Sequence, residues 1–89
     1  MSAQILNNPL NSFRQSHGLS QFALSLLLNV SVGMVATVES GVPKVLPDRL
    51  TAALKQYLTP EEQLEFIDTY ASWRTAARHA LKTRIRQKV

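Results

Sequence analysis

Cysteine is absent from this chain of 89 residues, so neither a disulfide framework nor a zinc site built on thiolates is possible. The two histidines, His17 and His79, lie far apart in the sequence and outside any ligand-spaced cluster, so we expect no metal site and no cofactor. No apolar run approaches the roughly 20 residues that cross a bilayer, and no signal-like segment opens the chain. We therefore expect a soluble, cytoplasmic protein without a membrane partner.

The residue groups on which enzymes rely are also missing. No nucleophile has a neighbouring base, and no glycine-rich loop would cradle a phosphate. The one pair of adjacent carboxylates, Glu61 and Glu62, follows Thr59-Pro60 and is accounted for by helix capping. We therefore expect no enzymatic activity.

What is present is enough for one small folded unit. Hydrophobic residues make up 45% of the chain, which suits a single domain over residues 1–89. The net charge of +4 favours acidic partners such as nucleic acid. The charges are segregated: residues 61–68 hold four acids and no base, and residues 74–89 hold six bases and no acid.

Start and stop signals between Gly18 and Gly41 predict two short helices joined by a tight turn. Ser20 is placed to cap the first, over about residues 21–28, and Ser31 to cap the second. Gly41 ends the second, because glycine accepts the left-handed backbone that closes a helix.

Three further helices are predicted around this pair, and no strand. One begins after Asn8-Pro9, and another begins at Leu46-Pro47-Asp48 and carries an apolar row as far as Leu58. The last begins at the capping box Thr59-Pro60-Glu61-Glu62 and runs into the 80s, since no glycine or proline follows it. The predicted fold class is therefore all-α, with five helices of which the C-terminal one is long.

Glycine, glutamine, hydroxyl and acidic residues stand at characteristic places in the central pair. They are Gly18-Leu19-Ser20-Gln21, Leu24, Asn29-Val30-Ser31, Val35, Val38, Glu39 and Gly41. With its continuation through Leu46-Pro47 to Leu54, this pattern over about residues 8–58 resembles the Cro and phage-repressor type (XRE-like) of helix-turn-helix domain. The resemblance implies a protein that binds double-stranded DNA as a two-fold homodimer.

The resemblance also implies which residues meet DNA. A glutamine placed like Gln21 contacts the DNA backbone in that family, and the recognition helix starts after a residue placed like Ser31. The implied DNA-binding residues are Gln21, Ser31, Val32, Gly33, Met34, Thr37 and, as a phosphate contact in the following loop, Lys44. A pair placed like Arg14 and Glu39 is structural and ties the first helix to the third.

The implied recognition face departs from the family in its chemistry. Residues 32–37 include no Arg, Lys, Asn or Gln, so the bidentate base contacts that supply about 1–3 kcal/mol of discrimination each are missing. Base readout would rest on Thr37 and on contacts of Val32 or Met34 with thymine methyl groups.

The second helix is apolar nearly all round. Phe22, Ala23, Leu26 and Leu27 occupy positions that the family fills with charged, solvated residues. Two explanations stand side by side. Either the fifth helix folds back over this surface, or the surface, with Phe22 and Leu26 at its centre, binds a protein.

The last helix, over residues 59–89, carries more apolar and basic side chains than one small core requires. Phe66, Tyr70 and Trp73 are spaced like a short coiled-coil seam, which predicts either a core contact or a protein interface, such as a dimer seam. Bases recur every fourth residue from Arg74 to Arg86, either as a solvated helix end or as a phosphate-tracking row.

Two functions remain open on this basis. The first is a small repressor-like transcription regulator that binds DNA as a homodimer. The second keeps the helix-turn-helix scaffold but uses it for protein–protein interaction, as an antirepressor, antitoxin or adaptor would, with weak or no DNA binding.

Overall fold

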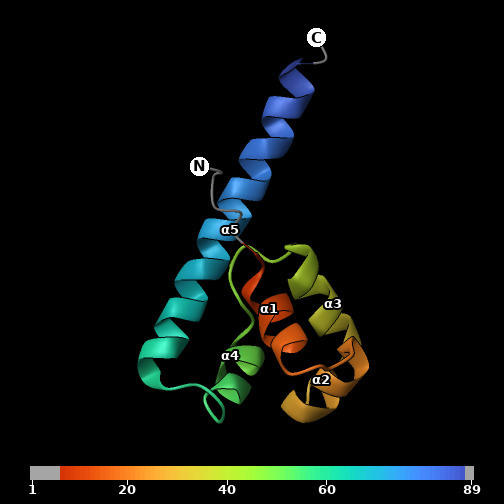
Figure 1. The fold of residues 1–89 in the computed structure, drawn as a ribbon, viewed down its shortest axis with the longest axis vertical. Helices are drawn as coiled ribbons and strands as arrows, with labels where there is room; N and C mark the ends of the chain where they lie inside the picture. Colours follow the sequence, from red (N-terminus) through yellow and green to blue (C-terminus); the bar gives the residue numbers. More distant parts are fainter. Residues whose placement is uncertain (1–6, 88–89) are drawn as a thin grey trace.

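The computed structural model describes residues 7–87, which form five α-helices and no strand (Figure 1). The helices are α1 (Pro9–Ser16), α2 (Gln21–Leu28), α3 (Val32–Ser40), α4 (Asp48–Leu54) and α5 (Pro60–Gln87). The predicted all-α class with a long C-terminal helix is confirmed.

Local side-chain chemistry accounts for where the first three helices begin and end. The side-chain oxygens of Asn8, Ser20 and Ser31 each accept a hydrogen bond from a backbone N–H in the first turn of the following helix. Asn29 ends α2 with a φ of 54°, and Gly41 ends α3 with a φ of 83°. Both residues belong to the types that tolerate this left-handed region.

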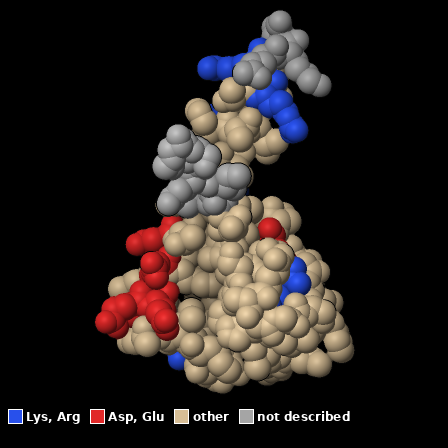
Figure 2. All heavy atoms as spheres, in the orientation of Figure 1, with Lys and Arg blue, Asp and Glu red and all other residues tan. Residues whose placement is uncertain are grey.

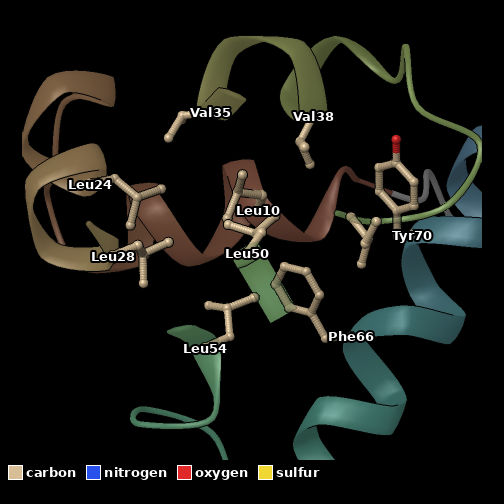
Figure 3. Packing of buried hydrophobic residues seen from close by; sticks show 10 residues of the cluster. Leu10, Leu24, Leu28, Val35, Val38, Leu50, Leu54, Phe66 and Tyr70 are labelled. Atoms are coloured by element: carbon tan, nitrogen blue, oxygen red, sulfur yellow. The ribbon is translucent and has the colours of Figure 1, made fainter. Parts of the chain in front are cut away.

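The core lies where all five helices converge (Figure 3). The chain bends by 114° between α2 and α3, so both helices direct leucine or valine side chains against α1. The buried hydrophobic residues are Leu10, Leu24, Leu28, Val35, Val38, Leu46, Leu50, Leu54, Phe66 and Tyr70.

Helix α5 packs against this body over its first half and then continues beyond it (Figure 1). Phe66 and Tyr70 are the anchors, and both are buried among residues of the other helices. From residue 75 to residue 86 every side chain is exposed except that of Ala77, which is half-buried. The molecule is therefore a small helical body with a projecting helical arm.

Helix α4 is shorter than predicted. It ends at Leu54, and Leu58 lies in the connection to α5, half-buried against the core. The N–H groups of Gln56 and Tyr57 bond to carbonyls three residues earlier, which tightens the chain into turns. Pro60 disfavours the helical conformation at Thr59, which separates this connection from α5.

Over residues 7–87, no single helix is both long and apolar enough to cross a membrane. Helices α2 and α3 reach the necessary length and apolar composition only when they are counted together across their bend.

We expect Gly41→Ala to destabilise the fold more than Gly18→Ala. Both glycines have positive φ, which costs an L-residue about 1–2 kcal/mol. A Cβ at Gly41 would also lie 2.7 Å from Cζ3 of Trp73, whereas a Cβ at Gly18 would meet nothing within 4 Å. This clash adds about 1–3 kcal/mol. Urea unfolding measures the free energy of unfolding of both variants, and an equal decrease in the two would contradict the expected order.

Candidate nucleic-acid interface

The carboxylate of Glu39 on α3 connects three helices. Its Oε2 lies 2.7 Å from Nε of Arg14, and its Oε1 accepts hydrogen bonds from Nη2 of Arg14 at 3.0 Å and Nδ2 of Asn11 at 3.0 Å. Nε2 of Gln21, the first residue of α2, donates to the same Oε1 at 3.2 Å. Arg14 also donates to the carbonyl of Leu19 at 3.0 Å. These contacts fix the orientation of α3 relative to α1 and α2.

The environment of Glu39 lowers the pKa of its carboxyl group. Its side chain is 7% exposed, and burial alone would raise the pKa. The hydrogen bonds from Arg14, Asn11 and Gln21, together with the charge of Arg14, outweigh burial. The carboxylate is therefore held in its charged form, as the ion pair with Arg14 requires.

Helix α3 presents one continuous exposed stripe. Val32, Gly33, Ala36, Thr37 and Ser40 are all exposed, and their spacing places them on one side of the helix. The hydroxyl of Thr37 donates to the carbonyl of Gly33 at 2.6 Å, so it is left as an acceptor toward solvent. The stripe carries no charged side chain.

The residues of this stripe are not all those predicted for the recognition face. Met34, predicted to point outward, is half-buried and packs against the core, since it lies next to the buried Val35 side of α3. Ala36 and Ser40 take part instead. Their positions four and eight residues after Val32 were the available signal.

The polar residues predicted to contact DNA lie around this stripe, but two of them have partners within the chain. Gln21 is half-buried and donates to Glu39. The hydroxyl oxygen of Ser31 accepts from the backbone N–H of Met34 at 3.0 Å. Lys44 is exposed in the loop after α3.

Gly33 has no role in the packing of the described chain. A Cβ at this position would meet only the hydroxyl of Ser31, at 3.8 Å, which is ordinary van der Waals contact. A glycine inside a helix costs about 0.5–1 kcal/mol relative to alanine. The chain therefore has a glycine near the start of the exposed stripe that its own packing does not require.

The outer surface of α2 stays uncovered. Phe22 is 64% exposed and Leu26 is 67% exposed, so the first of the two explanations, in which α5 folds back over them, is wrong. Helix α5 is instead held on the far side by Phe66 and Tyr70. A shallow groove runs beside Leu26, and its lining residues are Phe13, His17, Leu19, Ala23, Leu26, Leu27, Tyr57, Leu58 and Glu62.

For the aromatic row of α5, the core alternative is the one observed. Phe66 and Tyr70 are buried, so they offer no surface to a partner, and their assignment to a protein interface is wrong. Trp73 is half-buried, with its ring against Gly41. Both Phe66 and Tyr70 belong to the buried hydrophobic cluster that includes Leu10 of α1 and Leu50 of α4 (Figure 3).

Two polar contacts from α5 hold the loop that precedes Lys44. The guanidinium of Arg74 donates from Nε to the carbonyl of Gly41 at 2.8 Å, and the hydroxyl of Tyr70 donates to the carbonyl of Pro43. Burial raises the pKa of Tyr70, partly offset by the charge of Arg74. Arg74 was predicted only as the first member of a basic row, because its carbonyl partners lie more than thirty residues away.

Among residues 7–87 no group of three or more side chains is arranged to hold a metal ion. No family model matches the chain, and neither a curated protein nor a solved structure is significantly similar to it. The candidate site is therefore defined by its own geometry: the exposed stripe of α3, the N-cap at Ser31, and Lys44 in the loop that follows α3.

We expect Glu39→Gln to destabilise the protein in a pH-dependent manner. Removing the charge leaves Arg14 without its ionic partner and costs about 1–3 kcal/mol near neutral pH. Because the folded-state pKa of Glu39 is lowered, this stabilisation is complete above the unfolded pKa of about 4.3 and is lost as pH falls through the folded pKa. Urea unfolding of both proteins from pH 7 to pH 3 measures the difference. A difference that stays constant with pH would contradict the charged role of Glu39.

Proposed function

We propose that this chain is a small DNA-binding transcription regulator of the repressor type, which acts as a homodimer in the cytoplasm. The observation that carries the proposal is the exposed stripe of α3. The chain bends by 114° between α2 and α3, and no contact within the described chain requires a glycine at Gly33. A short helix followed by a sharply angled second helix is the arrangement with which helix-turn-helix proteins enter the major groove.

The resemblance to the Cro and phage-repressor domains supports this proposal at the level of local geometry. The features that support it are the left-handed turn at Asn29 and the N-cap at Ser31, which separate α2 from α3. The first N–H groups of a helix point outward along its axis and favour phosphate oxygens. In this arrangement the starts of α2 and α3 and the side chain of Lys44 contact the DNA backbone.

The chemistry of the stripe implies a particular mode of binding. With Val32, Ala36 and Thr37 at the base edges, readout rests on methyl contacts and on one hydroxyl acceptor. Gly33 allows the helix backbone to approach the bases closely. Sequence preference is therefore modest, and most of the affinity comes from backbone contacts.

We expect duplex affinity to fall as salt rises, and Lys44→Ala to make this dependence shallower. Each phosphate contact contributes about 0.9 to the slope of log K against log salt concentration. Lys55→Ala is the matched control, because Lys55 is also exposed but follows α4. Fluorescence anisotropy with a labelled mixed-sequence duplex measures the slopes. Affinity that does not respond to salt, or equal slopes for the two variants, would contradict the proposal.

A second variant separates stability from binding. Gly33→Ala should stabilise the protein by about 0.5–1 kcal/mol, since alanine favours the helix and its Cβ has room. The same methyl group should weaken duplex binding, because it holds α3 away from the groove. Thermal unfolding and anisotropy on one preparation report both effects. A variant that is more stable and binds duplex as the parent does would exclude close approach of α3 to DNA.

Protein binding through α2 is the alternative function that a specific observation favours. Phe22 and Leu26 form an exposed apolar surface next to the groove beside α1, and such surfaces on small proteins commonly mark protein contacts. In this alternative the chain acts as an antirepressor, antitoxin or adaptor with weak or no DNA binding. A folded chain with no duplex affinity even at low salt would favour it over the leading proposal.

A further inference from the structure

The far half of α5 has one side that is strongly basic. Residues 75–87 include no acid, and the side chains of Arg78, Lys82 and Arg86 are all exposed. Positions four apart differ by about 40° around a helix axis, so these three side chains lie within an arc of about 80°. Figure 2 shows basic side chains that project from this part of the molecule. We call Arg78, Lys82 and Arg86 the basic face.

The basic face has no acidic partner within the described chain. The one ion pair among the described side chains joins Arg14 to Glu39. The acid that precedes the basic face most closely is Asp68, about 15 Å along α5 from Arg78. Like charges at four-residue spacing destabilise a helix, and exposed side chains add little packing to offset this. A ligand with several negative charges would remove the repulsion.

The remaining surface of the far half of α5 does not suit a lipid membrane. Leu81 and Ile85 are its only large apolar residues in the described chain, and the other apolar residues between 75 and 87 are alanines. A helix that lies on a membrane presents a broad apolar face to the lipid. Charge, rather than apolar contact, therefore defines the partner of this surface.

The spacing of the basic face fits a row of negative charges. With a rise of about 1.5 Å per residue, successive bases are about 6 Å apart along the axis, and Arg78 and Arg86 are about 12 Å apart. Duplex DNA carries one negative charge per about 1.7 Å of its length. Arginine and lysine are also among the usual ligands of DNA phosphates. The charge pattern of a nucleic-acid backbone therefore matches the basic face.

The basic face begins close to the end of α3. The guanidinium of Arg74 donates from Nε to the carbonyl of Gly41 at 2.8 Å and from Nη2 to the carbonyl of Val42 at 3.4 Å. These bonds attach α5 to the loop that carries Lys44. Arg78 lies about 6 Å further along α5, and the helix continues past the end of α3 (Figure 1).

We propose that the basic face of α5 is a second nucleic-acid contact, which binds the phosphate backbone beside the segment that α3 enters. This inference rests on the proposed function and extends it, since that function places DNA only at α3, Lys44 and the helix starts. The contact adds affinity without base preference, because phosphates carry no sequence information. A short duplex that ends with the α3 segment leaves the basic face unoccupied, whereas a longer duplex occupies it.

The first test removes two charges from the basic face and compares the result with an equal loss elsewhere. The test variant is Arg78→Gln/Lys82→Gln, in which glutamine keeps a high helix propensity. The matched control is Arg49→Gln/Lys55→Gln, because Arg49 and Lys55 are exposed on and directly after α4. Circular dichroism checks that both variants remain helical.

Fluorescence anisotropy with a labelled duplex of about three helical turns measures the affinities. In the test variant the slope of log K against log salt concentration should become shallower by about 1.8, and affinity at about 0.1 M salt should fall roughly tenfold or more. The control should stay close to the parent. Hydrogen exchange gives a second measurement, in which duplex should slow exchange in residues 75–86 of the parent but not of the test variant.

The outcomes separate this proposal from the proposed function. Equal slopes for the test variant and the control, in a chain that binds duplex, would overturn the second contact and leave the α3 contact standing. An absence of duplex affinity even at low salt would overturn both. Affinity that falls in the test variant but is unchanged by Lys44→Ala and Gly33→Ala would support the basic face and count against α3.

A lipid surface is the remaining source of phosphate groups. The same variants are therefore mixed with vesicles of phosphatidylcholine and phosphatidylserine in equal parts, and sedimentation measures the bound fraction. We expect the test variant to lose duplex affinity whatever its affinity for vesicles. A test variant that loses vesicle binding but binds duplex as the control does would overturn the proposal.

Discussion

The carboxylate of Glu39 is the interaction on which the arrangement of the first three helices depends. It accepts hydrogen bonds from Arg14 and Asn11 on α1 and from Gln21 on α2, while its own helix carries the exposed stripe. Apolar packing alone is nearly indifferent to small rotations of a helix, whereas these bonds have defined directions. The network therefore sets the direction in which α3 faces.

This constraint has an energetic cost that the surroundings offset. A carboxylate that is almost buried is favourable only when it is paired and hydrogen-bonded, and its net contribution to stability can be close to zero. Its effect is then chiefly on geometry. Arg74 and Tyr70 act in a similar way at the other end of α3, where they hold the carbonyls of Gly41 and Pro43 in place.

Local signals predicted the helices well, because caps and left-handed positions depend on residues within a few places of one another. Ser31 and Gly41 mark the ends of α3 as expected. Contacts between distant segments were less accessible to sequence reasoning. The period of Phe66 and Tyr70 fitted both a core and a partner surface, and only the position of α5 against α1 and α4 decides between them. Met34 was misplaced because α3 carries apolar residues on its exposed side, such as Val32 and Ala36, as well as on its buried side, so that hydrophobicity alone does not indicate which side is buried.

The molecule has three exposed surfaces that differ in their chemistry. The stripe of α3 is small and uncharged, the outer side of α2 is large and apolar, and the arm of α5 is amphipathic with segregated charge. The proposed function uses the stripe of α3 together with Lys44 and the helix starts. DNA binding by α3 is therefore the central claim of the proposed function.

The most direct measurement of that claim is a map of backbone amide chemical shifts by NMR, recorded while a short DNA duplex is added to the isotopically labelled chain. The account predicts shifts concentrated at the start of α2, at residues 31–37 and at Lys44, with the acidic start of α5 unaffected. A spectrum that does not change, or changes confined to the outer side of α2 around Phe22 and Leu26, would contradict it.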